Sequence, residues 1–261
     1  MTEKFDAFGF DPTLVDKTLA RLDNYYRYWF RVEAGGLDNV PASGPAIFYG
    51  NHAGFNGLDY LMLQVAARRY STAKRFLRPL FHLGMEKAPL FGRFVSQNLG
   101  GVLGHPLNAE YLLNKGSAIL TYPEGGKSTG RPFKHRRLMC GREFFGKGFV
   151  KLAARCQAPM IPVATIGCEE ALPVLGFSKI LGRRFRFDDD LYPIFPQTFF
   201  SLVPRLAGFP IDGFHFLIAF PAKIKIKVGP AIAPPPENAV DHEWVTSYQT
   251  LEDMIQEMSH G

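Results

Sequence analysis

The chain has 261 residues, of which 46% are hydrophobic and 21% are charged, so it can bury one sizeable core and is not disordered as a whole. Its formal net charge of +6 suits an anionic partner, namely nucleic acid, a membrane surface or a phosphorylated ligand. A nucleic-acid partner is not expected, because the basic residues lack a recognised nucleic-acid motif and accompany 24 phenylalanines, a combination that favours a membrane surface.

An amphipathic helix is predicted over residues 12–30, because apolar side chains recur there at helical spacing: Val15, Leu19, Leu22, Tyr26 and Trp29. A loop at 36–45 follows, and a short buried strand at 46–50 leads into a second loop at 51–57. Further strands are predicted at 73–80, 100–104, 117–123, 160–167 and 222–229, and further helices at 60–69, 85–100, 108–116, around 149–156 and at 242–258.

This alternation of strands and helices indicates an α/β fold with a mostly parallel central sheet flanked by helices. Such sheets bind ligands at the carboxyl ends of their strands. Pro162 in strand 160–167 requires an edge position or a bulge. Since no linker divides the sequence, we expect a single domain over 36–261, preceded by an N-terminal amphipathic helical segment, 1–35.

His52 is a candidate base, because it directly follows the buried strand 46–50. Asp59 comes after six intervening residues that include Gly54 and Gly57, which permit a tight turn. A carboxylate that accepts a hydrogen bond from one ring nitrogen would fix the tautomer of His52 and stabilise its protonated form. The alternative is a loop histidine beside an aspartate that caps helix 60–69, and this segment alone leaves both interpretations open.

A second candidate segment, YPEGGKSTGRPF at 122–133, also follows a predicted strand. Glu124 offers a carboxylate to a substrate hydroxyl, and Gly125 and Gly126 leave backbone amides that face a ligand. Lys127 and Arg131 offer cations to a phosphate. The alternative is a glycine turn followed by a solvated basic loop.

Three segments resemble, in this order, the motifs of the glycerolipid acyltransferase superfamily, which includes bacterial lysophosphatidate acyltransferases. They are Asn51-His52 with Asp59, Tyr122-Pro123-Glu124-Gly125, and Ile161-Pro162-Val163. The resemblance extends over residues 25–230. Each motif is weak alone, and their joint order carries the resemblance.

The chain departs from the family pattern at two places. The family commonly has four residues between His and Asp, whereas this chain has six, with Gly57 at the usual acid position, so the acid's role passes to Asp59. The family's second motif ends in an Arg that binds the acceptor phosphate, whereas the matching stretch 98–109 offers only His105. We therefore expect an acceptor without a phosphomonoester, unless Lys127 and Arg131 replace the missing cation.

The resemblance implies an acyltransferase that moves a fatty acyl group from acyl-CoA or acyl-carrier protein to a glycerolipid or related lipid hydroxyl. His52 would act as the base and Asp59 would hold its ring, without an acyl-enzyme, a metal or a cofactor other than acyl-CoA as co-substrate. The alternatives are a CoA-independent phospholipid transacylase, a hydrolase that accepts water, and a non-catalytic lipid-binding membrane protein on the same fold.

The remaining features concern the compartment. Residues 1–13 carry Glu3, Asp6 and Asp11, unlike a secretory signal peptide, and no run of 18 apolar residues exists. The three cysteines lack a CxxC pair, which favours free thiols in a reducing compartment. We therefore expect a monotopic protein on the cytoplasmic face of a membrane, with segments 12–30 and 193–209 forming a basic, aromatic surface.

Overall fold

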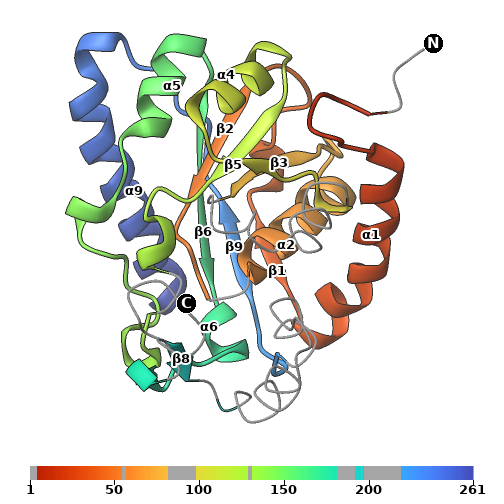
Figure 1. Ribbon diagram of the computed structural model, residues 1–261, viewed down its shortest axis with the longest axis vertical. Helices are drawn as coiled ribbons and strands as arrows, with labels where there is room; N and C mark the ends of the chain where they lie inside the picture. The colour runs from red at the N-terminus through yellow and green to blue at the C-terminus, as the bar shows by residue number, and fades with distance from the viewer. Residues whose placement is uncertain are drawn as a thin grey trace.

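The computed structural model describes residues 5–54, 57–81, 98–128, 131–180, 192–194, 196 and 219–260. A central sheet runs through the molecule, with helices on both faces (Figure 1). Its strand order is β1 (Glu33–Gly35), β9 (Lys225–Val228), β6 (Met160–Ile166), β2 (Ala46–Gly50), β5 (Ala118–Thr121), β3 (Leu77–Phe81) and β4 (Val102–Leu103). All neighbouring pairs are parallel except β6 and β9. The predicted α/β fold with a mostly parallel sheet is confirmed.

Strand β2 shows how the sheet separates two cores. Ala46 and Phe48 belong to the core beneath α1 (Pro12–Asn24) and α2 (Leu58–Val65). Ile47 and Tyr49 belong to the core beneath α4 (Pro106–Asn114), α5 (Gly148–Cys156) and α9 (Val240–His260). Since successive strand residues point to opposite faces, an uninterrupted apolar run is what a strand covered on both faces requires.

The predicted N-terminal helix packs against the main core and does not form a separate unit. Asp11 caps α1 by accepting hydrogen bonds from the backbone amides of Thr13 (2.9 Å) and Leu14 (3.2 Å). The apolar face of the helix, which includes Val15 and Leu19, is fully buried in the core that α2 shares. A π-helical turn at Tyr25–Trp29 continues α1 to the end of the predicted range.

Of the two positions expected for Pro162, an edge or a bulge, the structure has the bulge, because β6 lies inside the sheet and its antiparallel pairing shifts by one residue before it resumes at Met160 and Ile232. The last residue pair between β6 and β9 is Val163 with Val228, so Pro162 lies one position beyond that ladder. The carbonyl of Pro162 accepts a hydrogen bond from Gly229 N at 2.8 Å. A Cβ on Gly229 would lie 2.7 Å from Pro162 Cγ, so the glycine leaves the space that the ring occupies.

A short helix, α6 (Cys168–Ala171), follows β6 directly, and a two-stranded hairpin of β7 (Gly176–Ser178) and β8 (Tyr192–Ile194) lies beyond it. Both are at the lower end of the view in Figure 1, where the C-terminus also lies. Most of predicted helix 85–100 and of segment 193–209 falls outside the described residues. Among the described helices, none has both the length and the apolarity to cross a bilayer.

Candidate active site

The motif residues meet where β2, β5 and β6 end. Asn51, the first residue after β2, ties two of these ends together through its side chain. Its Nδ2 donates a hydrogen bond to Thr165 O, and its Oδ1 accepts one from Thr165 N, both at 2.8 Å. The asparagine amide therefore imitates one more peptide group of the β2–β6 ladder and holds the start of the next loop.

His52 and Asp59 form a hydrogen-bonded pair, with 2.6 Å between Nδ1 and Oδ2. Asp59 lies in the first turn of α2 and is fully buried. Its Oδ2 also accepts a hydrogen bond from Ala53 N at 3.0 Å, and its Oδ1 accepts one from Tyr60 N at 2.8 Å. The six-residue spacing is thus bridged, and the carboxylate is fixed by backbone amides as well as by the ring.

The ring of His52 is oriented on two sides. Asp59 accepts a hydrogen bond from Nδ1–H, so a neutral imidazole keeps its lone pair on Nε2. Tyr122 stacks on the ring at a centroid distance of 4.4 Å and an interplanar angle of 14°. The side chain of His52 is 19% exposed, which leaves the ring accessible to a substrate.

The pKa of the His52 imidazole is raised above its ordinary value. Burial acts to lower this pKa, but the charge and hydrogen bond of Asp59, followed by the charge of Glu124, outweigh it. Arg131 opposes the carboxylates and lowers the pKa.

Glu124 supports the backbone of His52. Its Oε2 accepts a hydrogen bond from His52 N at 2.9 Å. Its Oε1 accepts from Cys140 N at 2.5 Å and from Arg131 Nη2 at 3.1 Å. The carboxylate is fully buried, and the described hydrogen bonds of both its oxygens are internal ones.

A glycine turn follows Glu124. Gly125 N donates a hydrogen bond to Tyr122 O at 3.0 Å, so this amide closes the turn. Gly126 and Lys127 continue the turn as a 3-10 helix. The Lys127 side chain lies outside the described part of the structure.

Arg131 is not a solvent-facing cation. Its side chain is 7% exposed, and its guanidinium contacts Glu124 and, at 3.9 Å, Glu169 Oε1. The sequence interpretation missed Glu169 and the stacking role of Tyr122. Their position in the sequence could have identified them, because both follow the carboxyl end of a strand. Tyr122 comes directly after β5, and Glu169 follows β6 by three residues.

His105, the basic residue nearest the missing Arg of the second motif, has a local structural role. It is the N-cap of α4, and its Nδ1 accepts a hydrogen bond from Leu107 N at 3.3 Å.

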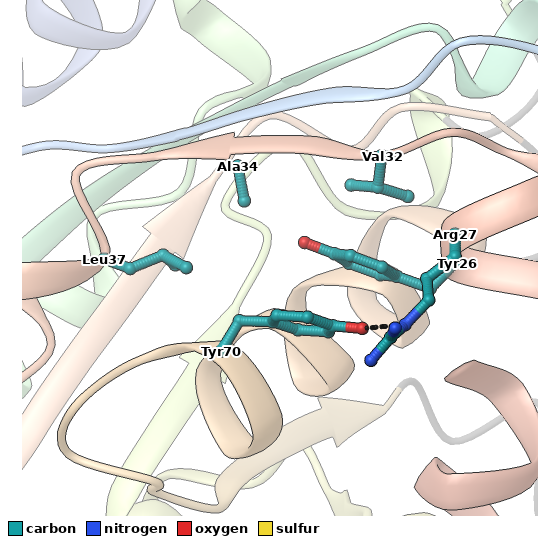
Figure 2. A pocket seen from close by; sticks show the side chains of 6 residues that line it. All are labelled: Tyr26, Arg27, Val32, Ala34, Leu37 and Tyr70. Atoms are coloured by element: carbon teal, nitrogen blue, oxygen red, sulfur yellow. Dashed lines mark hydrogen bonds between the residues drawn. The ribbon is translucent and has the colours of Figure 1, made fainter. Parts of the chain in front are cut away.

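A shallow pocket of about 510 Å³ lies elsewhere, between the π-helical turn Tyr25–Trp29 and the edge strand β1 (Figure 2). Arg27 and Tyr70 face each other across it, with Arg27 Nε donating to the Tyr70 hydroxyl at 2.7 Å. The remaining lining residues are Tyr26, Val32, Ala34 and Leu37. Because this lining contains none of the motif residues, we place the candidate site at the strand ends.

Comparison with known proteins identifies a family and a fold. A model of the acyltransferase family matches residues 31–166, just over half of the chain. The chain is 35% identical over 231 residues to an uncharacterised protein of Mycobacterium tuberculosis, covering 87% of this chain and 59% of the relative. It is 34% identical over 229 residues to one of Mycobacterium leprae, covering 87% and 58%. The chain thus spans about three-fifths of the length of these relatives.

The fold resembles that of the 1-acyl-sn-glycerophosphate (LPA) acyltransferase PlsC from Thermotoga maritima. The TM-score is 0.58 at 14% sequence identity, with 94% of this chain and 79% of that chain covered. The resemblance drawn from the motifs is therefore confirmed at the level of family and fold. Since the matched region contains His52, Asp59 and Glu124, and the chain folds as that enzyme does, this protein belongs to the acyltransferase family.

Proposed function

We propose that this protein transfers a fatty acyl group from a thioester donor, acyl-CoA or acyl-carrier protein, to a lipid hydroxyl. The observation that carries the proposal is the His52–Asp59 pair, with its 2.6 Å hydrogen bond inside the region that matches the family. A buried carboxylate on Nδ1 makes Nε2 the basic nitrogen of a partly exposed ring, which is the arrangement that activates a hydroxyl.

In this mechanism His52 Nε2 takes the proton of the acceptor hydroxyl as its oxygen attacks the thioester carbonyl. Asp59 stabilises the imidazolium that forms. The tetrahedral intermediate then collapses, the carbon–sulfur bond breaks, and the imidazolium returns the proton to the leaving thiolate. The products are the ester and the free thiol, and the acyl group is never attached to the protein.

The acceptor we favour lacks a phosphomonoester. A dianionic phosphate held away from water needs charge-assisted hydrogen bonds, ideally from Arg. Two cations, Lys127 and Arg131, were expected to supply these hydrogen bonds. Arg131 is buried between Glu124 and Glu169, so of the two only Lys127 remains to bind a phosphate. A monoacylglycerol or another neutral lipid alcohol therefore fits the described residues better than lysophosphatidate.

We also propose a membrane-facing surface at the end of the molecule where the strands carrying the site end. Four large apolar side chains are exposed there, with Leu175 at 65% and Ile180 at 82%. Together with the neighbouring cations they form what we call the apolar rim: Leu138, Leu175, Phe177, Ile180, Lys134 and Arg137. Phe133 N donates to Val174 O at 2.8 Å, which joins the two segments of the rim. Apolar side chains interleaved with cations suit an anionic lipid surface.

This surface replaces part of the one expected from the sequence. The apolar face of α1 is buried in the core, and the large hydrophobic side chains that segment 12–30 exposes are Tyr28 and Trp29. Trp29 Nε1 donates a hydrogen bond to Ala219 O, and Phe220 N donates one to Ala171 O of α6, so these aromatic residues connect to the same end of the molecule.

The proposed function is tested by incubating the purified chain with labelled acyl-CoA, or acyl-carrier protein, and equal amounts of monoacylglycerol and lysophosphatidate in mixed vesicles. We expect labelled diacylglycerol as the main product, and its loss in His52→Ala. A clear preference for lysophosphatidate would contradict the assignment of the acceptor. Release of free fatty acid without any acylated lipid would contradict acyl transfer itself.

A further inference from the structure

The pair of His52 and Asp59 lies in an unusually anionic environment for a base. Asp59 contacts the ring, and Glu124 accepts the backbone N–H of the same histidine at 2.9 Å. Each carboxylate favours the imidazolium, which cannot accept a proton. His52 can therefore act as a base beside Glu124 only if a cation offsets the negative charge of this second carboxylate.

Arg131 supplies that offset. It lies against Glu124, with 3.1 Å between Nη2 and Oε1, and its side chain is 7% exposed. Its charge lowers the pKa of His52, against the effect of both carboxylates. Because the guanidinium is buried, water screens this effect less than it would at the surface.

Glu169 completes the arrangement on the far side of Arg131. Its Oε1 lies 3.9 Å from Arg131 Nη1, too far for a hydrogen bond. Within the described residues, Arg131 Nη1 and Glu169 Oε2 are both buried without a hydrogen-bond partner. Burial raises the pKa of Glu169 to about 7; Arg131 opposes this, and Glu170 and Asp59 add to it. Glu169 therefore gains or loses its charge near neutral pH while it faces Arg131.

The fold brings this carboxyl to the site. The helix that carries Glu169 starts directly after β6, and a Cβ on Gly54 would lie 3.0 Å from Cys168 Cβ. Helix α6 is thus packed against the loop that begins with His52. Its next residue, Glu170, points instead to surface arginines: its Oε1 lies 3.3 Å from Arg136 Nε and 3.4 Å from Arg137 Nη2.

We infer that Arg131 and Glu169 are positioning residues: with Glu124 they form a buried row of alternating charges that fixes the backbone of His52 and sets the field at its ring. The inference rests on the proposed role of His52 as the base. When Glu169 is neutral, the charge of Arg131 acts on Glu124 and His52 alone. When Glu169 is ionised, it cancels part of that charge, and the ring holds its proton more firmly.

The test is the titration of the His52 ring by NMR in the full chain, without substrate, with its signal assigned through His52→Ala. Arg131→Gln is expected to raise the midpoint by about one pH unit, the effect of one charge removed at close range. Glu169→Gln is expected to lower it, and Arg131→Lys to stay close to the wild type. The matched controls Glu110→Gln and Arg155→Gln change a surface ion pair between α4 and α5, with 3.4 Å between Glu110 Oε2 and Arg155 Nη2, and should leave the midpoint in place.

An unchanged midpoint in folded Arg131→Gln or Glu169→Gln overturns the inference, as does an equal shift in the controls. If Arg131→Gln does not fold, Glu169→Gln and Arg131→Lys decide the question. Since the titration needs no substrate, an inactive wild-type chain would overturn the proposed function and leave this result standing. In an active chain, the acid limb of kcat/KM should move with the NMR midpoint in every variant.

Discussion

The position of Asp59 depends on the backbone conformation of one residue, Gly57. Gly57, the residue before α2, has φ of 72°, a left-handed conformation that favours glycine. This turn admits two more residues than the family pattern and still brings Asp59 into the first turn of α2. There the unpaired backbone amides of a helix N-terminus favour a carboxylate. The acid has therefore moved along the sequence while its contact with His52 is kept.

Asp59→Asn should reduce kcat by about 10²–10⁴-fold, because the amide keeps the size of the side chain but no longer stabilises the imidazolium. The measurement is steady-state turnover of the purified variant, with circular dichroism to verify folding. Asp16→Asn serves as the control, since Asp16 pairs with Arg68 on the surface at 2.7 Å and should leave kcat unchanged. Full activity in folded Asp59→Asn would remove Asp59 from the mechanism.

The pH dependence follows from the direction of the His52 shift. The base must be unprotonated in the free enzyme, so kcat/KM should fall as the pH falls through the His52 pKa. Because that pKa is raised, chiefly by Asp59 against the effect of burial, the decline should be centred above 6.5. A profile of kcat/KM from pH 5 to 9 measures the position. A midpoint below 6.5 would show that burial outweighs the carboxylates.

At the scale of elements, β6 has a neighbour that must fit it closely. Gly229 lies beside the ring of Pro162, and a methyl group there would approach the ring to 2.7 Å. The contact lies three residues before Thr165, which β6 places against Asn51 of the site. A change at Gly229 therefore acts on the site through the strand, although the glycine touches none of the site residues.

Gly229→Ala should destabilise the protein by about 1–3 kcal/mol, the usual cost of overpacking. The measurement is the urea midpoint at constant slope. Gly148→Ala in α5 is the control, because a Cβ there meets no atom within 4 Å and alanine favours a helix. Equal stability of the two variants would show that the Pro162 contact relaxes without cost.

The spacing of apolar residues was sufficient to predict the longer elements of the described ranges, because apolar runs such as 46–50 and 160–167 suit strands covered on both faces. It did not predict the short elements β1, β7, β8 and α6, which hold few residues each. It could not decide between an edge and a bulge for Pro162, since the bulge depends on Gly229, which is distant in sequence. Likewise the pattern at 122–131 identified Glu124 and Arg131 as chemical groups. Their burial against each other and against Glu169 arises from tertiary packing, which the pattern of one segment does not contain.

At the scale of the whole molecule, the proposed base and the apolar rim lie at the same end. Helix α6 links them, because Cys168 packs on Gly54 of the His52 loop and Glu170 pairs with Arg137 of the rim. An acceptor held in a lipid layer would then reach His52 without leaving that layer completely. This geometry predicts that membrane binding and acyl transfer are weakened by the same surface changes.

The double variant Leu175→Asp/Ile180→Asp should bind anionic vesicles at least about tenfold more weakly, because two exposed apolar side chains no longer enter the lipid and two negative charges are added. Liposome flotation measures the effect. The control is Leu107→Asp on α4, which is 67% exposed and belongs to a helix at the opposite end of the molecule from β8 (Figure 1). Equal flotation of both variants and the wild type would count against the rim as the membrane surface.

Because of the hydrogen bonds between Asn51 and Thr165, the amide exchange of a strand residue can report on the opening of the site. The amide proton of Thr165 is held by a side chain at the start of the His52 loop, so it can exchange with solvent only when that loop separates from β6. Its deuterium exchange rate therefore measures how often the base leaves its working position. We expect Thr165 to exchange as slowly as the strand interior in the wild type and markedly faster in Asn51→Ala, with the exchange of Phe48 unchanged.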